Sequence, residues 1–325
     1  MSEARGSSDK KRVQLERLLK LAEGLPALSM AVVHPVDEES LSGALEAGEA
    51  GLIEPVLVGP EHRIRACADK AGVDLGKWRL VSTEHSHAAA ETAARMAGEG
   101  EVAGLMKGSL STREFMGAIV PRAAGLRTGR RMSHVWVMDV PSYPRPLLIT
   151  DSAINIHPDL MTKADIVSNA IDLAVAMGTE NPRVAIISAT EEVNPALQST
   201  LDAAALCKMA ERGQIRGGRL DGPLAFDNAI SEEAARAKGI DGEVAGRADI
   251  LLAPDVESAN MLGKQLHYLA GADAAGIVLG ARVPVVLTSR ADDRFARQAA
   301  CAIAQLQHKA EQERRERAIR ERDGS

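Results

Sequence analysis

The sequence has 325 residues, long enough for about two domains, and 45% of them are hydrophobic, which suffices for a sizeable core. A formal net charge of −6 and an aromatic content of 2% argue against nucleic-acid binding, which needs basic surfaces and stacking rings. Three widely spaced cysteines, with no signal-peptide pattern and no apolar run of ~18 residues, predict a cytoplasmic protein without disulfides, zinc or a membrane span.

Short apolar runs alternate with helical patterns along most of the chain. Residues 10–24 have the amphipathic pattern of a helix, and the charge-balanced residues 308–325 are expected to form a solvated helix end. This alternation predicts an α/β fold with mainly parallel sheets covered by helices on both faces. The short connection at 141–145 suits a local antiparallel pair. The expected strands are residues 28–35, 54–60, 77–83, 102–108, 134–141, 145–151, 182–188, 248–255, 274–280 and 283–289.

Polar side chains follow the expected strand at 102–108, at the edge where α/β sheets bind ligands. Ser111 and Glu114 have capping-box spacing, so a helix should begin there. Lys107 and Arg113 flank that helix N-terminus, where the helix dipole disfavours cations unless an anion joins them. A well-capped helix without a ligand is the alternative interpretation. The candidate anion site contains Lys107, Ser109, Thr112 and Arg113.

A second polar loop follows the strand at 145–151 and precedes a long amphipathic pattern. His157, next to Pro158, has the chemistry of a base, but a single loop histidine is more often a structural hydrogen-bonding residue. Thr162 and Asp165 offer another capping arrangement. The polar residues of this loop are Asp151, Ser152, Asn155 and His157.

The stretch PVVLTSRADD, residues 284–293, places a hydroxyl, a guanidinium and two carboxylates at the end of a short apolar strand. No Walker A, GxGxxG, HExxH or GxSxG pattern occurs in the chain. The polar strand ends therefore suit a phosphorylated substrate that is handled without a metal.

Four blocks, taken together, resemble the phosphate acetyltransferase/butyryltransferase family, and the likeness extends over about residues 28–303. The resemblance implies transfer of an acetyl or butyryl group between phosphate and coenzyme A, by direct attack of the CoA thiolate. It implies no metal and no tightly bound cofactor, with CoA, acyl phosphate and phosphate as small-molecule substrates. The four blocks are residues 31–60, 147–159, 221–231 and 248–293.

The resemblance also implies an architecture. Two αβα domains with mainly parallel sheets should adopt an isocitrate/isopropylmalate-dehydrogenase-like arrangement, with the active-site cleft between them. Residues 1–139 and 278–325 should form the first domain, and residues 140–277 should form the second as an insertion. The expected assembly is a homodimer.

Roles at the strand end 284–293 follow from the same resemblance. Arg290 should bind phosphate, Ser289 should stabilise the oxyanion on the acyl carbon, and Asp292 should take the proton of the CoA thiol. Asp293 is the expected helix cap, although the two aspartates could exchange roles. The Ser-Arg-Ala-Asp-Asp order is similar to the butyryl-type branch. The substrate-binding residues implied are Lys107, Ser109, Thr112, Arg113, Asn260 and Lys264.

Two other functions stay open at this point. One is a non-catalytic acyl-CoA-binding regulatory module of the same family, against which the retained Ser289, Arg290 and Asp292 argue. The other is a β-decarboxylating dehydrogenase on the same fold, which would need a metal-binding carboxylate cluster that the sequence does not suggest.

Overall fold

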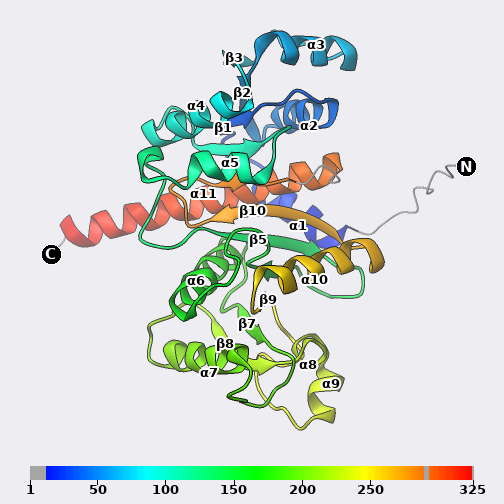
Figure 1. Cartoon of the computed structure of the whole chain (residues 1–325), viewed down its shortest axis with the longest axis vertical. Helices are drawn as coiled ribbons and strands as arrows, with labels where there is room; N and C mark the ends of the chain where they lie inside the picture. Colours follow the sequence, from blue (N-terminus) through cyan, green and yellow to red (C-terminus); the bar gives the residue numbers. More distant parts are fainter. Residues whose placement is uncertain (1–11, 289–292, 324–325) are drawn as a thin grey trace, which may run out of the picture.

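A computed structural model describes residues 12–288 and 293–323, and these form one large α/β structure (Figure 1). Its eleven-stranded sheet has the order β3-β2-β1-β4-β11-β10-β5-β6-β9-β7-β8. The strands are β1 (Leu28–Val33), β2 (Ile53–Gly59), β3 (Arg79–Ser82), β4 (Gly104–Lys107), β5 (Ser133–Asp139), β6 (Leu147–Thr150), β7 (Arg183–Ile187), β8 (Arg219–Leu224), β9 (Ile250–Leu252), β10 (Asp273–Leu279) and β11 (Val285–Val286).

Helices cover both faces of this sheet. The helices are α1 (Val13–Ala22), α2 (Glu38–Glu49), α3 (Glu61–Ala71), α4 (Ser86–Glu99), α5 (Thr112–Ile119), the 3-10 turn η1 (Arg122–Ala124), α6 (Leu160–Ala176), α7 (Gln198–Glu211), α8 (Phe226–Ile230), α9 (Glu232–Ala237), α10 (Val256–Leu269) and α11 (Arg294–Asp323). The α/β class with a mainly parallel sheet is thus confirmed.

All ten expected strands are present, and β8 was missed. Its sequence, RLDGPL, lacks an apolar run and contains Pro223, which cannot donate to a ladder. The strand pairs only with β7 at the end of the sheet, and an edge position tolerates a proline.

The strands do not all run the same way. The antiparallel strand β10 lies between β11 and β5, and β6 is antiparallel to β5, as the short connection predicted. Consequently β1 to β5 and β11 run in one direction, while β6 to β10 run in the other. The carboxyl ends of β4 and β11 therefore meet at one edge, and that of β6 lies toward the opposite edge.

The long helix α11 packs across the middle of the sheet, against α1, α2 and α6 (Figure 1). Its residues 299–304, AACAIA, are almost completely buried, and their small side chains let the helix lie close to β10. At ~1.5 Å per residue the helix extends beyond the core, so its residues 312–321 are exposed, as the charge pattern predicted. No helix in the described ranges combines the length and the apolar character of a membrane span.

Helix α6 begins earlier than its sequence suggested. Asp159 is the N-cap and accepts a hydrogen bond from the Thr162 backbone N–H at 2.8 Å. The predicted Thr162–Asp165 capping arrangement is therefore wrong, because both residues already lie inside the helix. Asp165 instead accepts a hydrogen bond from the Arg131 backbone N–H at 2.9 Å.

The sheet continues without interruption from β3 to β8, so its strand order alone sets no domain boundary. The division into residues 1–139 plus 278–325 and residues 140–277 stays a prediction.

A buried ion pair joins α6 to α7 and yields a stability prediction. The Lys163 Nζ lies 2.6 Å from Asp202 Oδ2, and the two side chains are only 6% and 8% exposed. Lys163→Met keeps the length of the side chain but leaves the carboxylate buried without its cation. We expect the free energy of unfolding, measured with urea, to fall by ~3–5 kcal/mol.

The control for this variant is Arg65→Gln, which removes the exposed Arg65–Glu61 ion pair. It should change the free energy of unfolding by less than ~1 kcal/mol, because solvent screens exposed pairs. A similarly small effect of Lys163→Met would contradict the prediction.

Candidate active site

Three neighbouring strands, β1, β4 and β11, end at the same edge of the sheet and deliver polar side chains there. Lys107 is the last residue of β4, and Thr288 follows β11. Two of the polar segments singled out in the sequence are thus neighbours in space although about 180 residues separate them. Ser289, Arg290 and Asp292 lie outside the described residues, directly after Thr288.

The first turn of helix α11 packs against this edge of the sheet and contacts it through Arg297. Arg297 is buried, and its Nη1 donates a hydrogen bond to Thr288 Oγ1 at 3.1 Å. The Thr288 hydroxyl in turn donates to the Lys107 carbonyl oxygen at 3.3 Å. The buried Lys107 ammonium lies 3.3 Å from the Gly108 carbonyl oxygen. The residue that precedes positions 289–292 is therefore tied both to β4 and to the first turn of α11.

Asp37 connects the end of β1 with the end of β4. It caps α2 by accepting a hydrogen bond from the Ser40 backbone N–H at 2.8 Å. Burial acts to raise the pKa of Asp37, but hydrogen bonds from Ser109 and Ser40 and the positive charge of Arg297 outweigh it and hold the pKa below its ordinary value. Ser109, a predicted site residue, thus contacts an anion of the protein itself.

The connection from β4 to this site passes very close to β1. A Cβ atom on Gly108 would lie 2.4 Å from the Val33 carbonyl oxygen, so only glycine fits there. His34, which has a positive φ of 57°, bonds through Nδ1 to the Ser109 carbonyl oxygen at 2.9 Å. Its Nε2 is buried without a hydrogen-bond partner among the described residues. The sequence analysis missed His34, because the expected strand at 28–35 included it, whereas β1 ends at Val33.

The two aspartates of the motif can be distinguished in part. Asp293 Oδ1 accepts a hydrogen bond from the Ala296 backbone N–H at 2.9 Å, which confirms that Asp293 caps α11. Its Oδ2 lies 2.5 Å from Arg12 Nη2. Both oxygens of Asp293 are therefore engaged by the protein itself, and the assignment of the base to Asp292 stays a prediction.

Helix α5 starts where the sequence predicted. Ser111 is its N-cap and accepts a hydrogen bond from the Glu114 backbone N–H at 3.1 Å. The reciprocal half of the capping box is absent, because the Glu114 carboxylate accepts a hydrogen bond from Ser86 Oγ at 2.6 Å. Thr112 is half-buried and Arg113 is exposed in the first turn, so an anion can reach the Arg113 guanidinium.

The predicted residues Asn260 and Lys264 lie on α10, which is on the same side of the sheet as α5 in Figure 1. The Asn260 amide donates to the Ser152 carbonyl oxygen at 3.2 Å, while Lys264 is exposed. A Cβ atom on Gly263 would lie 2.1 Å from the Trp136 ring, which shows how closely α10 approaches β5. No contact joins Asn260 or Lys264 to the strand-end group in the described part of the chain.

Hydrogen bonds to a buried carboxylate, that of Asp151, hold the polar loop after β6 in place. Asp151 is buried and accepts hydrogen bonds from the backbone N–H of His134 at 3.1 Å and from the Asn155 side chain at 2.6 Å. Burial raises the pKa of its carboxyl group against these hydrogen bonds. His157 is exposed. These contacts favour the structural interpretation of the loop.

A second buried histidine, His134, lies on β5 and was not singled out from the sequence. Its ring packs edge-on against Trp136, with a centroid distance of 5.6 Å, and burial lowers its pKa to about 3. Neither ring nitrogen has a hydrogen-bond partner among the described residues. Residues 12–288 and 293–323 contain no group of three His, Cys, Asp or Glu side chains placed to hold a metal ion.

Comparison with known proteins decides the family. A family model described as phosphate acetyl/butaryl transferase matches residues 86–304, about two thirds of the chain. A phosphate acetyltransferase of Rhizobium meliloti is 58% identical over 291 residues, which cover 90% of this chain and 92% of the relative. The chain belongs to this family. It is therefore an enzyme of the transferase class.

Some relatives within the family are named phosphate acetyltransferase and others phosphate butyryltransferase. A phosphate butyryltransferase of Clostridium acetobutylicum is 43% identical, with 85% of this chain and 92% of the relative covered. A phosphate acetyltransferase of Thermotoga maritima is 42% identical, with 86% and 94% covered. The expected closeness to the butyryl-type branch is not supported, because the 58% relative is an acetyltransferase by name.

Solved structures of the family share the fold. A branched-chain phosphotransacylase from Enterococcus faecalis V583 superimposes with a TM-score of 0.74 at 27% identity, covering 86% of this chain and 99% of that one. A phosphotransacetylase from Streptococcus pyogenes gives a TM-score of 0.76 at 22% identity, covering 90% and 98%.

The close approach at Gly108 leads to a matched pair of variants. In Gly108→Ala the new Cβ would meet backbone oxygen, so we expect the free energy of unfolding to fall by ~1–3 kcal/mol. Gly117→Ala, inside α5 with no atom within 4 Å of the new Cβ, should raise the same quantity by ~0.5–1 kcal/mol. Urea denaturation of both variants measures the difference, and equal effects would contradict the steric argument.

The lowered pKa of Asp37 predicts a pH dependence of stability. A carboxylate with a depressed folded-state pKa contributes stability above its unfolded pKa of ~3.9 and loses it as the pH falls through the folded-state value. Asp37→Asn should therefore destabilise the protein at pH 7, and the difference from the parent should vanish in acid. A difference that is constant from pH 7 down to the acid limit would show that the charge of Asp37 contributes nothing.

Proposed function

We propose that the protein transfers a short acyl group between phosphate and coenzyme A: acyl phosphate + CoA = acyl-CoA + phosphate. The family membership and the identity to relatives named phosphate acetyltransferase and butyryltransferase support this reaction. The same identities argue against a non-catalytic binding module.

The observation that carries the proposal is the network at the ends of β4 and β11. Thr288 is bonded on one side to the Lys107 backbone and on the other to the buried Arg297 guanidinium. This network fixes the chain immediately before Ser289 and Arg290, and the capped start of α11 fixes it immediately after Asp292. The proposed catalytic residues are thus carried between two anchored ends, at an edge that also has Lys107 and Arg297 as cations.

Each residue has a role that its chemistry can supply. The planar guanidinium of Arg290 suits a phosphate group, and the hydroxyl of Ser289 can donate to the oxyanion that forms on the acyl carbon. The carboxylate of Asp292 can take the proton of the thiol, since the thiolate is the nucleophile. The thiolate then attacks the acyl carbon, the bond to the phosphate oxygen breaks, and phosphate leaves with the electron pair.

Further binding roles are proposed for residues at the end of β4, in the β4–α5 connection, in α5 and in α10. Arg113, Lys107, Ser109 and Thr112 would contact phosphate or CoA from the side of α5, and Asn260 and Lys264 from the side of α10. We also propose two αβα domains in an isocitrate/isopropylmalate-dehydrogenase-like arrangement, with the active-site cleft between the two domains, and a homodimer. The strand order supports a division near β5 and β10, because β1 to β4 and β11 lie on one side of this pair and β6 to β9 lie on the other.

The test of the reaction is thioester formation, followed by ultraviolet absorbance, with CoA and acetyl, propionyl or butyryl phosphate in metal-free buffer. Turnover with any acyl phosphate would establish the reaction, and the ranking of kcat/KM would give the acyl preference. Binding of CoA without turnover would instead favour the non-catalytic module.

The base assignment gives a sharper prediction. Asp292→Asn should lower kcat by about 100-fold or more, the usual effect of losing a general base. Asp293→Asn is the matched control: it keeps a capping side chain, so turnover should stay within about tenfold of the parent. If Asp292→Asn also stays within tenfold, a barrier change of ~1.4 kcal/mol or less, the base lies elsewhere.

A further inference from the structure

A hollow of about 360 Å³ lies at the far end of α5 from Lys107, between the loop that follows η1 and the loop that follows β6. This size is within the range of small-molecule sites. We call it the arginine hollow, after the residues that define it: Arg122, Arg127, Arg130, Arg131, Asn155 and Asp165.

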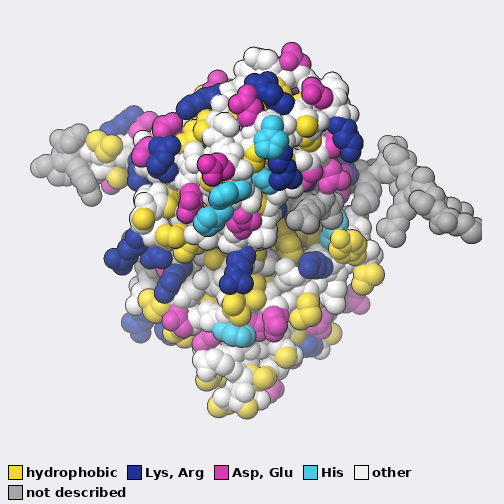
Figure 2. Space-filling view, turned by 45° about the horizontal axis from the view of Figure 1, so that its top comes forward, with side chains coloured by type: hydrophobic (Ala, Val, Ile, Leu, Met, Phe, Trp, Pro, Cys, Tyr) yellow, Lys and Arg dark blue, Asp and Glu magenta, His cyan; other side chains and the backbone are white. Residues whose placement is uncertain are grey.

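The charge of the arginine hollow is opposite to that of the whole chain. Four arginines line it, against a formal net charge of −6 for the protein. On the side of the molecule where α11 ends, Figure 2 shows a gathering of Lys and Arg side chains. The lining carboxylate, Asp165, already accepts a hydrogen bond from the Arg131 backbone N–H. Four arginines against one carboxylate leave the lining with a net positive charge, and a concave surface of net positive charge concentrates anionic ligands.

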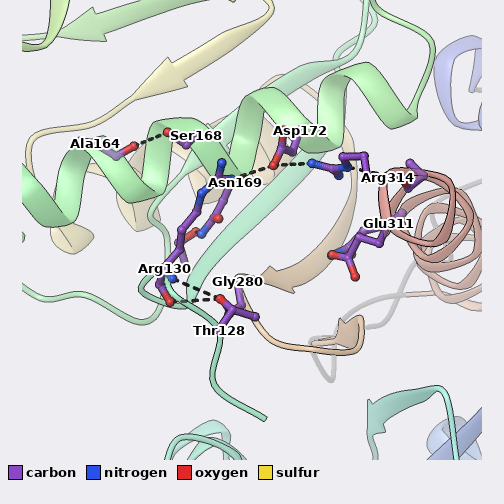
Figure 3. Close-up of polar contacts among 12 residues, drawn as sticks. Thr128, Arg130, Ala164, Ser168, Asn169, Asp172, Gly280, Glu311 and Arg314 are labelled. Carbon is purple, nitrogen blue, oxygen red and sulfur yellow. Dashed lines mark hydrogen bonds and ion pairs between the residues drawn. The ribbon is translucent and has the colours of Figure 1, made fainter. Parts of the chain in front are cut away.

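Arg130 is committed to a protein carboxylate, whereas the other guanidiniums keep donors for a ligand. Arg130 Nη1 lies 2.7 Å from Asp172 Oδ2 on α6, an oxygen that it shares with Arg314 at 2.6 Å (Figure 3). Arg127 donates through its Nε to the Val120 carbonyl oxygen at 2.7 Å, so its two terminal nitrogens stay available to a ligand.

Arg122 and Arg131 are exposed side chains of the hollow. Their guanidiniums make no hydrogen bond and no ion pair within the part of the chain that the structure describes. The positive charge of Arg131 reaches as far as Asp159, whose pKa it helps to lower after the hydrogen bonds from Thr162. Both guanidiniums can therefore turn to an anion without breaking a protein contact.

The backbone that carries these arginines is held in place. Thr128 Oγ1 donates to the Gly280 carbonyl oxygen at 2.7 Å (Figure 3). Arg127 forms a β-bridge with Ala281. Across the hollow, the Asn155 amide donates to the Met132 carbonyl oxygen at 2.8 Å. A fixed backbone lowers the ordering cost of binding, because only side chains must adjust.

From this geometry we infer that the arginine hollow binds the phosphate groups of a phosphorylated small molecule. Guanidinium forks match the paired oxygens of phosphate, and several forks around one hollow suit a di- or polyphosphate better than a single carboxylate. The phosphate groups can belong to CoA, bound with its thiol at the end of β4, or to a separate phosphorylated compound.

The position of the hollow favours CoA as the source. Helix α5 begins three residues after Ser109, and its C-cap, Val120, lines the hollow. Its eight residues span ~12 Å at ~1.5 Å per residue. An elongated ligand along α5 would thus reach both the proposed site of acyl transfer and the arginines. This assignment to CoA rests on the proposed function, whereas the phosphate site itself does not.

The test uses pyrophosphate as the probe and the full chain, with calorimetric titration at low ionic strength, where charge interactions are least screened. The Arg122→Gln/Arg131→Gln double variant should weaken pyrophosphate binding at least tenfold. The matched control is Arg63→Gln/Arg212→Gln, which removes two exposed arginines from α3 and the end of α7. It changes the net charge equally and should bind pyrophosphate like the parent.

The result that overturns the inference is the absence of pyrophosphate binding to the parent, or equal binding by the two double variants. Thermal melting within about 2 °C of the parent, as expected for exposed substitutions, shows that the variants are folded. A second arm titrates CoA and dephospho-CoA. Displacement of pyrophosphate by CoA, with CoA weakened in the hollow variant, identifies CoA as the ligand.

If CoA leaves pyrophosphate bound, the site takes a separate phosphorylated compound, and the phosphate site still stands. Because these titrations need no turnover, a failure of the proposed acyl transfer would not be mistaken for a failure of the phosphate site.

Discussion

The central pairing of β10 is the constraint on which the site depends. This strand runs antiparallel between β11 and β5, and Gly276 sits at its middle. A Cβ atom there would lie 2.5 Å from the Leu287 carbonyl oxygen and 3.0 Å from His134 Nε2. Only glycine lets β11 approach closely enough to pair with both β10 and β4. Without that pairing, the motif after β11 would not reach the end of β4.

The ends of β1 and β11 are held in place by the contacts of a buried charge, the Arg297 guanidinium. Arg297 is buried behind the sheet and acts on two elements at once, by donating to Thr288 and by lowering the pKa of Asp37. A buried guanidinium is costly unless its donors are satisfied, so this arrangement fixes α11 relative to β1 and β11. The same helix is capped by Asp293, which also binds Arg12 before α1. The site edge is thus connected to three helices that pack on one face.

Helix α5 connects the two polar regions of the other face. Its N-terminus begins next to Ser109, and its C-terminus leads into the loop of the arginine hollow. A helix is a rigid spacer, so it fixes the distance between the proposed site of chemistry and the inferred phosphate site. In acyl transfer to a large carrier, such a spacing would let binding energy far from the reacting atoms position the thiol.

Strands and helix caps were predictable from the sequence where their cause is local, and not where it depends on the rest of the fold. The alternation of apolar runs and amphipathic patterns determined the α/β class and ten strands, because burial on a sheet leaves a local signature. Ser111 and Asp293 were recognisable as caps, since capping acts over three residues. Edge strand β8 left no such signature, and the Thr162–Asp165 arrangement was wrong because Asp159 competes three residues earlier.

By itself, the sequence determined the family, the fold class and the motif at residues 284–293, all of which lie in contiguous stretches. Only the tertiary structure decided which polar strand ends meet. The parallel pairing of β11 with β4 brings Thr288 to Lys107, and the antiparallel pairing of β5 with β6 turns the end of β6 away. The tertiary structure also revealed the roles of Arg297 and His34 and the presence of the arginine hollow. Burial and the approach of distant segments leave no trace in residue order.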